Sequence, residues 1–181
     1  MKRFFLVGFA LHALSMAPSQ ATADDAPPHE VERTLSVQGF VGPLEDFPRG
    51  GIGLHFGWQI SERLRLGPQL TWYVPRAYGN VRRHLVDAGL ALGVDILRSS
   101  SLTWAFDTGL SLGAFVDDYQ RVYDDVVRIA PGIHLGTSLE LRVWPRVRPY
   151  VGVRLAAYFA DSVTDTQWIE GFFGIRAVIG R

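Results

Sequence analysis

The sequence contains no cysteine, and its only lysine is Lys2. The absence of cysteine excludes a disulfide framework and thiol chemistry. Its 18 basic and 18 acidic residues give a formal net charge of zero, so the composition provides no electrostatic case for nucleic-acid binding. No apolar run approaches the roughly 20 residues that a membrane-spanning helix needs. The 181 residues are sufficient for one domain.

The N-terminal stretch has the organisation of a secretory signal peptide. Two basic residues precede a short apolar run over Phe4–Leu14, and Ala21–Ala23 fits the small-x-small cleavage pattern. We expect residues 1–23 to be cleaved, the alternative being a buried N-terminal helix. Residues 24–33 are polar and contain a Pro-Pro pair, so we expect a flexible segment there. An exported chain without a spanning helix can still enter a membrane as a closed β-barrel.

Strict alternation of apolar with small or polar residues dominates the rest of the chain. It is clearest over the 15 residues of Leu102–Val116, where none of the residues on the apolar face is charged and the other face carries Asp107. A period of two is the signature of a β-strand with one apolar and one polar face. The length of this segment suits a tilted strand that crosses a bilayer.

The same pattern predicts an all-β domain over residues 34–181. The expected strands cover residues 34–41, 51–60, 64–74, 84–97, 102–116, 126–143, 149–159 and 167–179. Short turns follow the second, fourth and sixth strands, and longer polar loops, including an arginine-rich one at residues 75–83, follow the others. This alternation is typical of an eight-stranded antiparallel up-and-down transmembrane β-barrel with four external loops.

Alternation alone does not say which face points outward, and a soluble lipocalin-like barrel would have its apolar face inside. The apolar face of the expected strands carries no acidic or basic residue, as a lipid-facing surface requires. The other face holds most of the glycines, which suit a narrow lumen. Aromatic residues near strand ends suggest interfacial girdles; they are Trp58, Trp72, Tyr73, Trp104, Trp144, Tyr150, Tyr158, Phe159 and Trp168. We therefore expect the apolar face to contact lipid.

Two prolines fit this pattern poorly. Pro68 and Pro131 lie inside expected strands, where each lacks the N–H that a ladder hydrogen bond requires. We expect a local bulge or an end-of-strand position at each of them.

The leader, the eight alternating segments and a final strand at Gln167–Ile179 together resemble the eight-stranded outer-membrane β-barrel superfamily. The OmpA transmembrane domain and OmpX are small barrels of this type. The resemblance is one of architecture, and it implies a location in the outer membrane of a Gram-negative cell and insertion by the barrel-assembly machinery. Such chains usually end on an aromatic residue, whereas this one ends on Gly180-Arg181. Recognition by that machinery would then use Phe173, Ile175 and Ile179.

The polar face predicts a network of charges inside the barrel. Its members are Arg65, Asp87, Asp95, Asp107, Arg128, His134, Glu140, Arg142, Arg154, Glu170 and Arg176, joined by His55. Unpaired charges in a narrow interior would be costly, so ion pairs that fill the lumen are one interpretation. A polar, gated path for ions is the other. An eight-stranded interior is just wide enough for side chains to fill it, which argues against a permanent wide pore.

Catalysis receives little support from the sequence. His134, Ser138 and Glu140 share one face of a strand, but four residues of extended chain separate His134 from Ser138 by roughly 13 Å, too far for a hydrogen bond. Lipid A deacylases and palmitoyltransferases resemble this chain in architecture only. The first needs His and Ser together on the lipid face and the second an apolar interior, whereas this interior is expected to be ionic. We expect no enzymatic activity and no cofactor.

The expected loops carry two charged clusters. Arg76, Arg82 and Arg83 could contact lipopolysaccharide phosphates, or form an ordinary solvated loop. Asp117, Asp118, Asp124 and Asp125 bracket the third loop, but their spacing matches no calcium-binding motif, so no metal site is assigned.

The sequence thus favours a monomeric outer-membrane barrel with a salt-bridged lumen and a structural or surface-binding role. Outer-membrane lipids, lipopolysaccharide and the barrel-assembly machinery are the expected partners, and nucleic acid is not. Three alternatives remain: a narrow porin-like channel for ions or small solutes, a lipid A-modifying enzyme and a soluble lipocalin-like binder.

Overall fold

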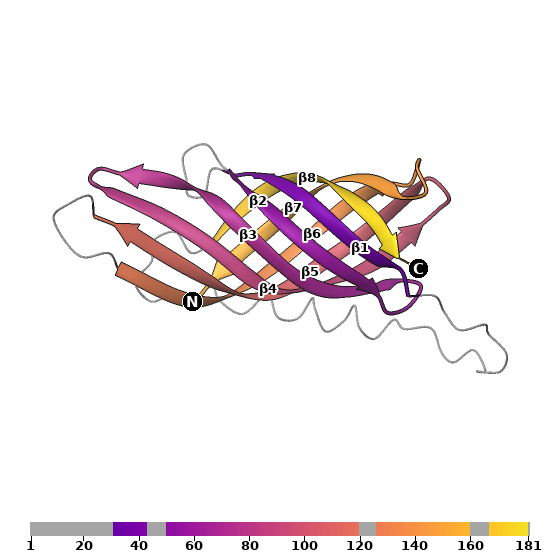
Figure 1. The fold of residues 1–181 in the computed structure, drawn as a ribbon, viewed down its shortest axis with the longest axis horizontal. Coiled ribbons are helices and arrows are strands. Elements are labelled where there is room, and N and C mark those ends of the chain that lie inside the picture. The colour runs from indigo at the N-terminus through magenta and orange to yellow at the C-terminus, as the bar shows by residue number, and fades with distance from the viewer. Residues whose placement is uncertain (1–30, 43–49, 120–125, 160–166, 181) are drawn as a thin grey trace, which may run out of the picture.

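A computed structural model describes residues 31–42, 50–119, 126–159 and 167–180. The expected signal peptide lies outside these residues. The strands are β1 (Arg33–Val41), β2 (Gly50–Gln59), β3 (Leu64–Tyr78), β4 (Val81–Arg98), β5 (Leu102–Asp118), β6 (Val126–Leu141), β7 (Val147–Tyr158) and β8 (Gln167–Gly180). Each pairs antiparallel with its neighbour in sequence, and β1 pairs with β8 to close the barrel (Figure 1). The predicted eight-stranded up-and-down barrel is confirmed.

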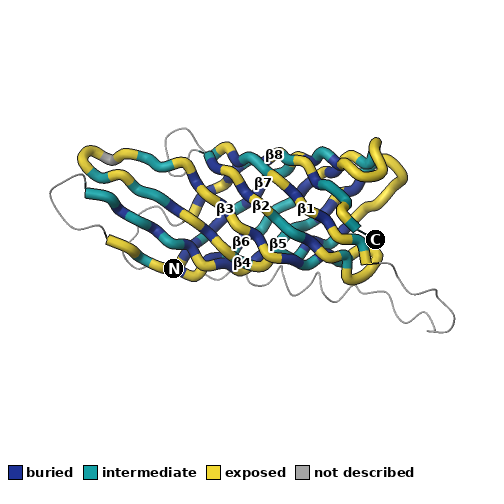
Figure 2. The backbone as a smooth tube through the Cα atoms, in the orientation of Figure 1, coloured by how far each residue is buried: buried dark blue, intermediate teal, exposed yellow. Residues whose placement is uncertain are grey.

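The apolar face points outward. Leu110 and Ile129 are about 70 % exposed, whereas Tyr73 and Asp87 on the opposite face are fully buried. Exposed and buried positions therefore alternate along the strands (Figure 2). A closed barrel whose exterior is apolar and uncharged between the strand ends, around a polar interior, is the transmembrane arrangement, because lipid satisfies no backbone hydrogen bond. Within the described ranges no helix is long and apolar enough to span a bilayer.

The barrel is taller on one side. Strands β3 to β6 contain 15 to 18 residues, whereas β1 and β2 contain 9 and 10, close to what a tilted strand needs to cross a membrane. The β3–β4 and β5–β6 pairs consequently reach beyond the other strands at the end opposite the short turns (Figure 1). We call this the loop end, and the other the turn end.

The prediction of a loop at residues 75–83 is wrong. Strands β3 and β4 continue until Tyr78 pairs with Val81, which leaves only Gly79 and Asn80 in the turn. Gly79 has a φ of +58°, a conformation that glycine adopts without steric cost. A bulge between Tyr73 and Arg76 absorbs the break in alternation at Pro75. The arginines of this stretch accordingly lie on strands.

The two prolines are accommodated without a bulge at either position. Pro68 pairs in register with Leu90, while the pairing of β3 with β2 is interrupted opposite Gly67 and Pro68 without a change of register. Pro131 lies where the β6–β7 ladder ends, with its carbonyl accepting from the N–H of Phe159. The missing N–H groups thus fall where a neighbouring ladder is interrupted or finished.

The aromatic residues divide between the two faces. Trp58, Trp72, Trp104, Trp144 and Phe159 are exposed on the outer side. Tyr73, Tyr150, Tyr158 and Trp168 are instead buried in the lumen, so their assignment to a girdle is wrong. The interior is therefore not purely ionic: rings from β3, β5, β7 and β8 form an aromatic layer in which Tyr158 stacks on Trp168 with centroids 5.4 Å apart.

Candidate functional site

Glu140 of β6 is the centre of an ion-pair layer near the turn end. Its carboxylate contacts Arg176 of β8, Arg65 of β3 at 3.6 Å and Arg148 of β7 at 3.7 Å. Arg65 also pairs with Asp95 at 3.0 Å, and Arg148 pairs with Glu32 at 2.6 Å. We call these six residues the turn-side plug. Because the arginines come from three strands around the barrel, the plug crosses the lumen.

Glu170 of β8 is the centre of a second layer, nearer the loop end. One of its oxygens accepts from Arg154 Nε at 2.7 Å and from the Tyr73 hydroxyl at 3.3 Å, and the other accepts from Trp168 Nε1 at 3.1 Å. The Arg154 guanidinium also lies over the Phe40 ring, 4.3 Å from its centroid. We call Tyr73, Arg154, Trp168 and Glu170 the loop-side plug. The buried Arg154–Glu170 ion pair is thus supported by hydrogen bonds from Tyr73 and Trp168, as a low-dielectric interior demands.

A third buried cluster joins β4, β5, β6 and β7. His134 Nε2 lies 2.9 Å from Asp87 Oδ2 and 2.8 Å from Ser111 Oγ, and the Tyr158 hydroxyl donates to Asp87 at 2.6 Å. These are the residue types of a hydrolytic triad, but the geometry differs. In a triad the acid and the nucleophile bond opposite ring nitrogens, whereas here both contact the same nitrogen. The cluster is an arrangement that packs the lumen.

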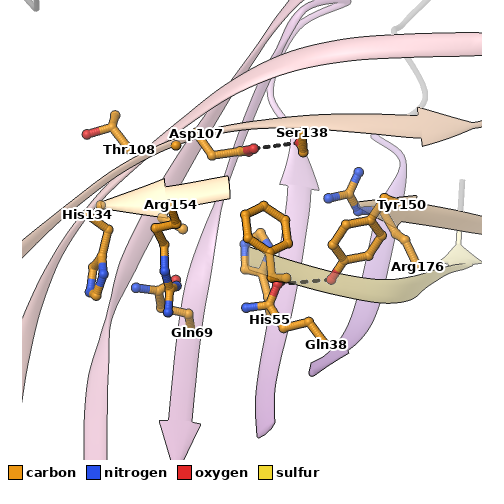
Figure 3. Close-up of a pocket in the computed structure, with 14 residues that line it drawn as sticks. Gln38, His55, Gln69, Asp107, Thr108, His134, Ser138, Tyr150, Arg154 and Arg176 are labelled. Atoms are coloured by element: carbon orange, nitrogen blue, oxygen red, sulfur yellow. Dashed lines mark hydrogen bonds between the residues drawn. The ribbon is translucent and has the colours of Figure 1, made fainter. Parts of the chain in front are cut away.

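A cavity of about 50 Å³ lies in the lumen, lined by residues of both plugs. All eight strands contribute side chains to its wall (Figure 3). Asp107 accepts from the Ser138 hydroxyl at 2.7 Å, and Gln38 accepts from the Tyr150 hydroxyl at 3.1 Å. His134 also contributes to the wall. A cavity of this size holds a few water molecules or one small ion.

The arginines predicted to contact lipopolysaccharide lie on both faces of the extended β3–β4 hairpin. Arg83 faces inward, where it and Arg128 of β6 both pair with the buried carboxylate of Asp117. Arg76 is directly opposite Arg83 in register and so shares its inward face. Arg82 is exposed and alternates outward, on the same face as Val86. Of these three arginines, Arg82 is therefore the one that projects from the outer wall.

The other predicted lumen residues can now be placed. Asp107 lines the cavity, Arg128 lies at the loop end, and Arg142 lies just past the last residue of β6, half-buried at the turn end. His55 also lines the cavity. Asp124 and Asp125 of the third loop lie outside the described residues. Among those that are described, no three His, Cys, Asp or Glu side chains form a group able to hold a metal.

Several participants were missed at the level of sequence. Tyr73 and Trp168 bond Glu170, Ser111 and Tyr158 complete the His134 cluster, and Gln38 lines the cavity. All five alternate with outward apolar residues, and that inward position was the available signal. Their mutual contacts cross strands as far apart in sequence as β3 and β8, so only barrel closure shows them.

Comparisons with known proteins bear on the fold. No protein-family model and no curated protein sequence matches the chain. Among solved structures, Neisserial surface protein A has 19% sequence identity and a TM-score of 0.63, covering 83% of this chain and 96% of its own. The N-terminal β-barrel domain of Pseudomonas aeruginosa OprF has 11% identity and a TM-score of 0.61, with coverages of 81% and 98%.

This chain has the fold of the small outer-membrane β-barrels. The resemblance to the OmpA transmembrane domain and OmpX is thereby confirmed for the architecture. Another similar structure is Ail, the attachment invasion locus protein of Yersinia pestis, in complex with the heparin analogue sucrose octasulfate. It shares 8% identity with this small barrel at a TM-score of 0.55, with coverages of 82% and 97%.

Proposed function

We propose that this protein is a monomeric integral outer-membrane barrel with a closed lumen and a structural or surface-binding role, exported by a cleavable signal peptide. The pair of buried ion-pair layers that cross the lumen carries this proposal. A solute on the barrel axis would have to break charge pairs that are held in a low-dielectric interior, at a cost of several kcal/mol each. We therefore propose that the function of the protein lies in its surface and not in its lumen.

The surface proposed to bind is the outer wall of the β3–β4 hairpin, through Arg82. This arginine is exposed on the outward face, next along that face to His84 and the lipid-facing Val86. Just beyond an apolar band is the depth at which lipid phosphates lie, and guanidinium groups bind phosphate in a bidentate fashion. Lipopolysaccharide phosphate is therefore the proposed ligand. Sucrose octasulfate, the polyanion in the Ail complex, supports the idea that a barrel of this fold can hold anionic groups.

The test compares Arg82→Gln with Arg63→Gln, which removes another exposed arginine, from the turn at the opposite end. Both variants are refolded into nanodiscs that contain labelled lipopolysaccharide at limiting amounts. We expect Arg82→Gln to lower the enrichment of lipopolysaccharide around the barrel several-fold, because one charge-assisted contact is lost. Arg63→Gln should leave this enrichment unchanged. Equal enrichment in wild type and Arg82→Gln would contradict the proposal.

Insertion by the barrel-assembly machinery is proposed to use the outward face of β8. Phe173, Ile175 and Ile179 are 60%, 56% and 54% exposed on that face, so all three are accessible to a partner before lipid covers them. We propose no catalytic role, because the Asp87–His134–Ser111 geometry is not that of a triad. Turnover of labelled lipid A by the pure protein would overturn this.

A narrow gated channel is the second candidate. The observation in its favour is the polar cavity that lies in the lumen and is lined by Arg154 of one plug and Arg176 of the other. It would provide a hydrated step for an ion if both plugs opened. Planar-bilayer conductance distinguishes the two candidates, since a closed barrel gives no stable current.

A further inference from the structure

Three buried polar atoms in the wall of the lumen cavity have no hydrogen-bond partner among the described residues. They are Nε2 of Gln69, whose residue is 8% exposed, Nδ1 of His134, whose residue is 3% exposed, and Nε2 of the half-buried His55. An unsatisfied polar atom in a protein interior costs free energy comparable to a lost hydrogen bond. All three residues belong to the cavity wall, so an occupant of the cavity is the partner that would satisfy these atoms.

The charge of the lining indicates what that occupant is. The charged side chains that line the cavity are Arg154, Arg176 and Asp107. The acids that pair with the two arginines, Glu170 and Glu140, do not belong to the lining. Asp107 is engaged by Ser138 Oγ at 2.7 Å. Guanidinium groups and an amide nitrogen are donors, and they bind anions; a hard cation would need several free oxygens.

We propose that the lumen cavity is a binding site for a single small monovalent anion of the halide class. The amide of Gln69 donates to the ion, and Arg154 and Arg176 on β7 and β8 supply the positive field (Figure 3). His134 Nε2 is already held by Asp87 and Ser111, so its Nδ1 bonds a water of the ion's shell. The cavity of about 50 Å³ accommodates an ion together with a water.

The cavity is lined by Arg154 of one plug and Arg176 of the other, so the ion is supplied while the barrel folds around the site. The whole protein is therefore refolded in sodium bromide and crystallised, and anomalous scattering is measured at the bromine edge. We expect a peak in the cavity within hydrogen-bond reach of Gln69 Nε2. Ordered waters without bromide, or a caesium peak in the cavity of protein refolded in caesium, would overturn the proposal.

A second measurement uses variants. Gln69→Leu and Gln69→Glu remove the donor or place a like charge against the ion, whereas Gln167→Leu makes the same change on an exposed residue of β8. Because a ligand bound only to the folded state stabilises it, bromide should raise the urea midpoint of wild type relative to the Gln69 variants at equal ionic strength. We expect binding to weaken about tenfold in Gln69→Leu, the effect of one lost hydrogen bond to a charge. An identical bromide response in Gln69→Leu, Gln167→Leu and wild type would place the ion elsewhere and contradict the site.

Discussion

Among the glycines of the described residues, Gly67 has the least room for a side chain. A Cβ built on it would lie 1.7 Å from the carbonyl oxygen of Phe56, well inside any allowed contact. The pairing of β2 with β3 is interrupted at Gly67, so the backbone there departs from the regular ladder. Glycine at this position is a requirement for close approach of two strands, and its role in a narrow lumen is steric.

Gly67→Ala should therefore lower the free energy of unfolding by about 3 kcal/mol, because Phe56 and its strand must move to admit a methyl group. The matched control is Gly171→Ala, where a Cβ would make only an ordinary contact of 3.9 Å with the carbonyl oxygen of Val41. Urea titration of the refolded barrels measures both. Equal midpoints for the two variants would show that β2 and β3 separate freely.

Glu140 illustrates how one acid can hold three bases. Glu140→Gln removes the charge that Arg65, Arg148 and Arg176 share and leaves them close together in the lumen. We expect a loss of about 3 kcal/mol in unfolding free energy, because removing one partner leaves buried charges without a counter-charge. Glu62→Gln, the same change on an exposed turn residue, should be neutral. The contrast between the two in urea unfolding is the test, and a neutral Glu140→Gln would mean that the turn-side plug contributes no stability.

At the scale of elements, the β3–β4 hairpin shows where local sequence signals compete. Pro75 and the arginines of residues 75–83 suggest a loop, yet Gly79-Asn80 is a dipeptide that favours a two-residue hairpin turn. The turn signal prevails because strands β3 and β4 pair on both sides of the Tyr73–Arg76 bulge. The other strand boundaries were predicted within a few residues, since alternation marks them directly.

The turn makes a specific prediction. Gly79→Ala should cost about 1 kcal/mol, because an L side chain is strained at a φ of +58°. Gly79→Asn should cost less, since asparagine tolerates this conformation. Proteolysis of the hairpin tip in the folded barrel reports the local opening, and equal cleavage of both variants would contradict the role of the backbone conformation.

At the scale of the whole molecule, the two plugs lie in series along one lumen. A single opening would leave the other in place, so Glu140→Gln and Glu170→Gln should each remain closed in planar-bilayer recordings, like wild type. The double variant removes both central acids and should conduct. Discrete openings of the wild-type protein, or full conductance in either single variant, would instead favour the channel as its function.

The sequence by itself determined the architecture of this protein. Period-two alternation separates a lipid face from a lumen face, because successive side chains of a strand point to opposite sides, and the absence of charge on one face shows which side meets lipid. The tertiary structure alone decided the partners within the lumen. Residues such as Tyr73 and Glu170 meet only because closure of β1 on β8 brings the strands around a narrow interior, and no local spacing encodes that contact.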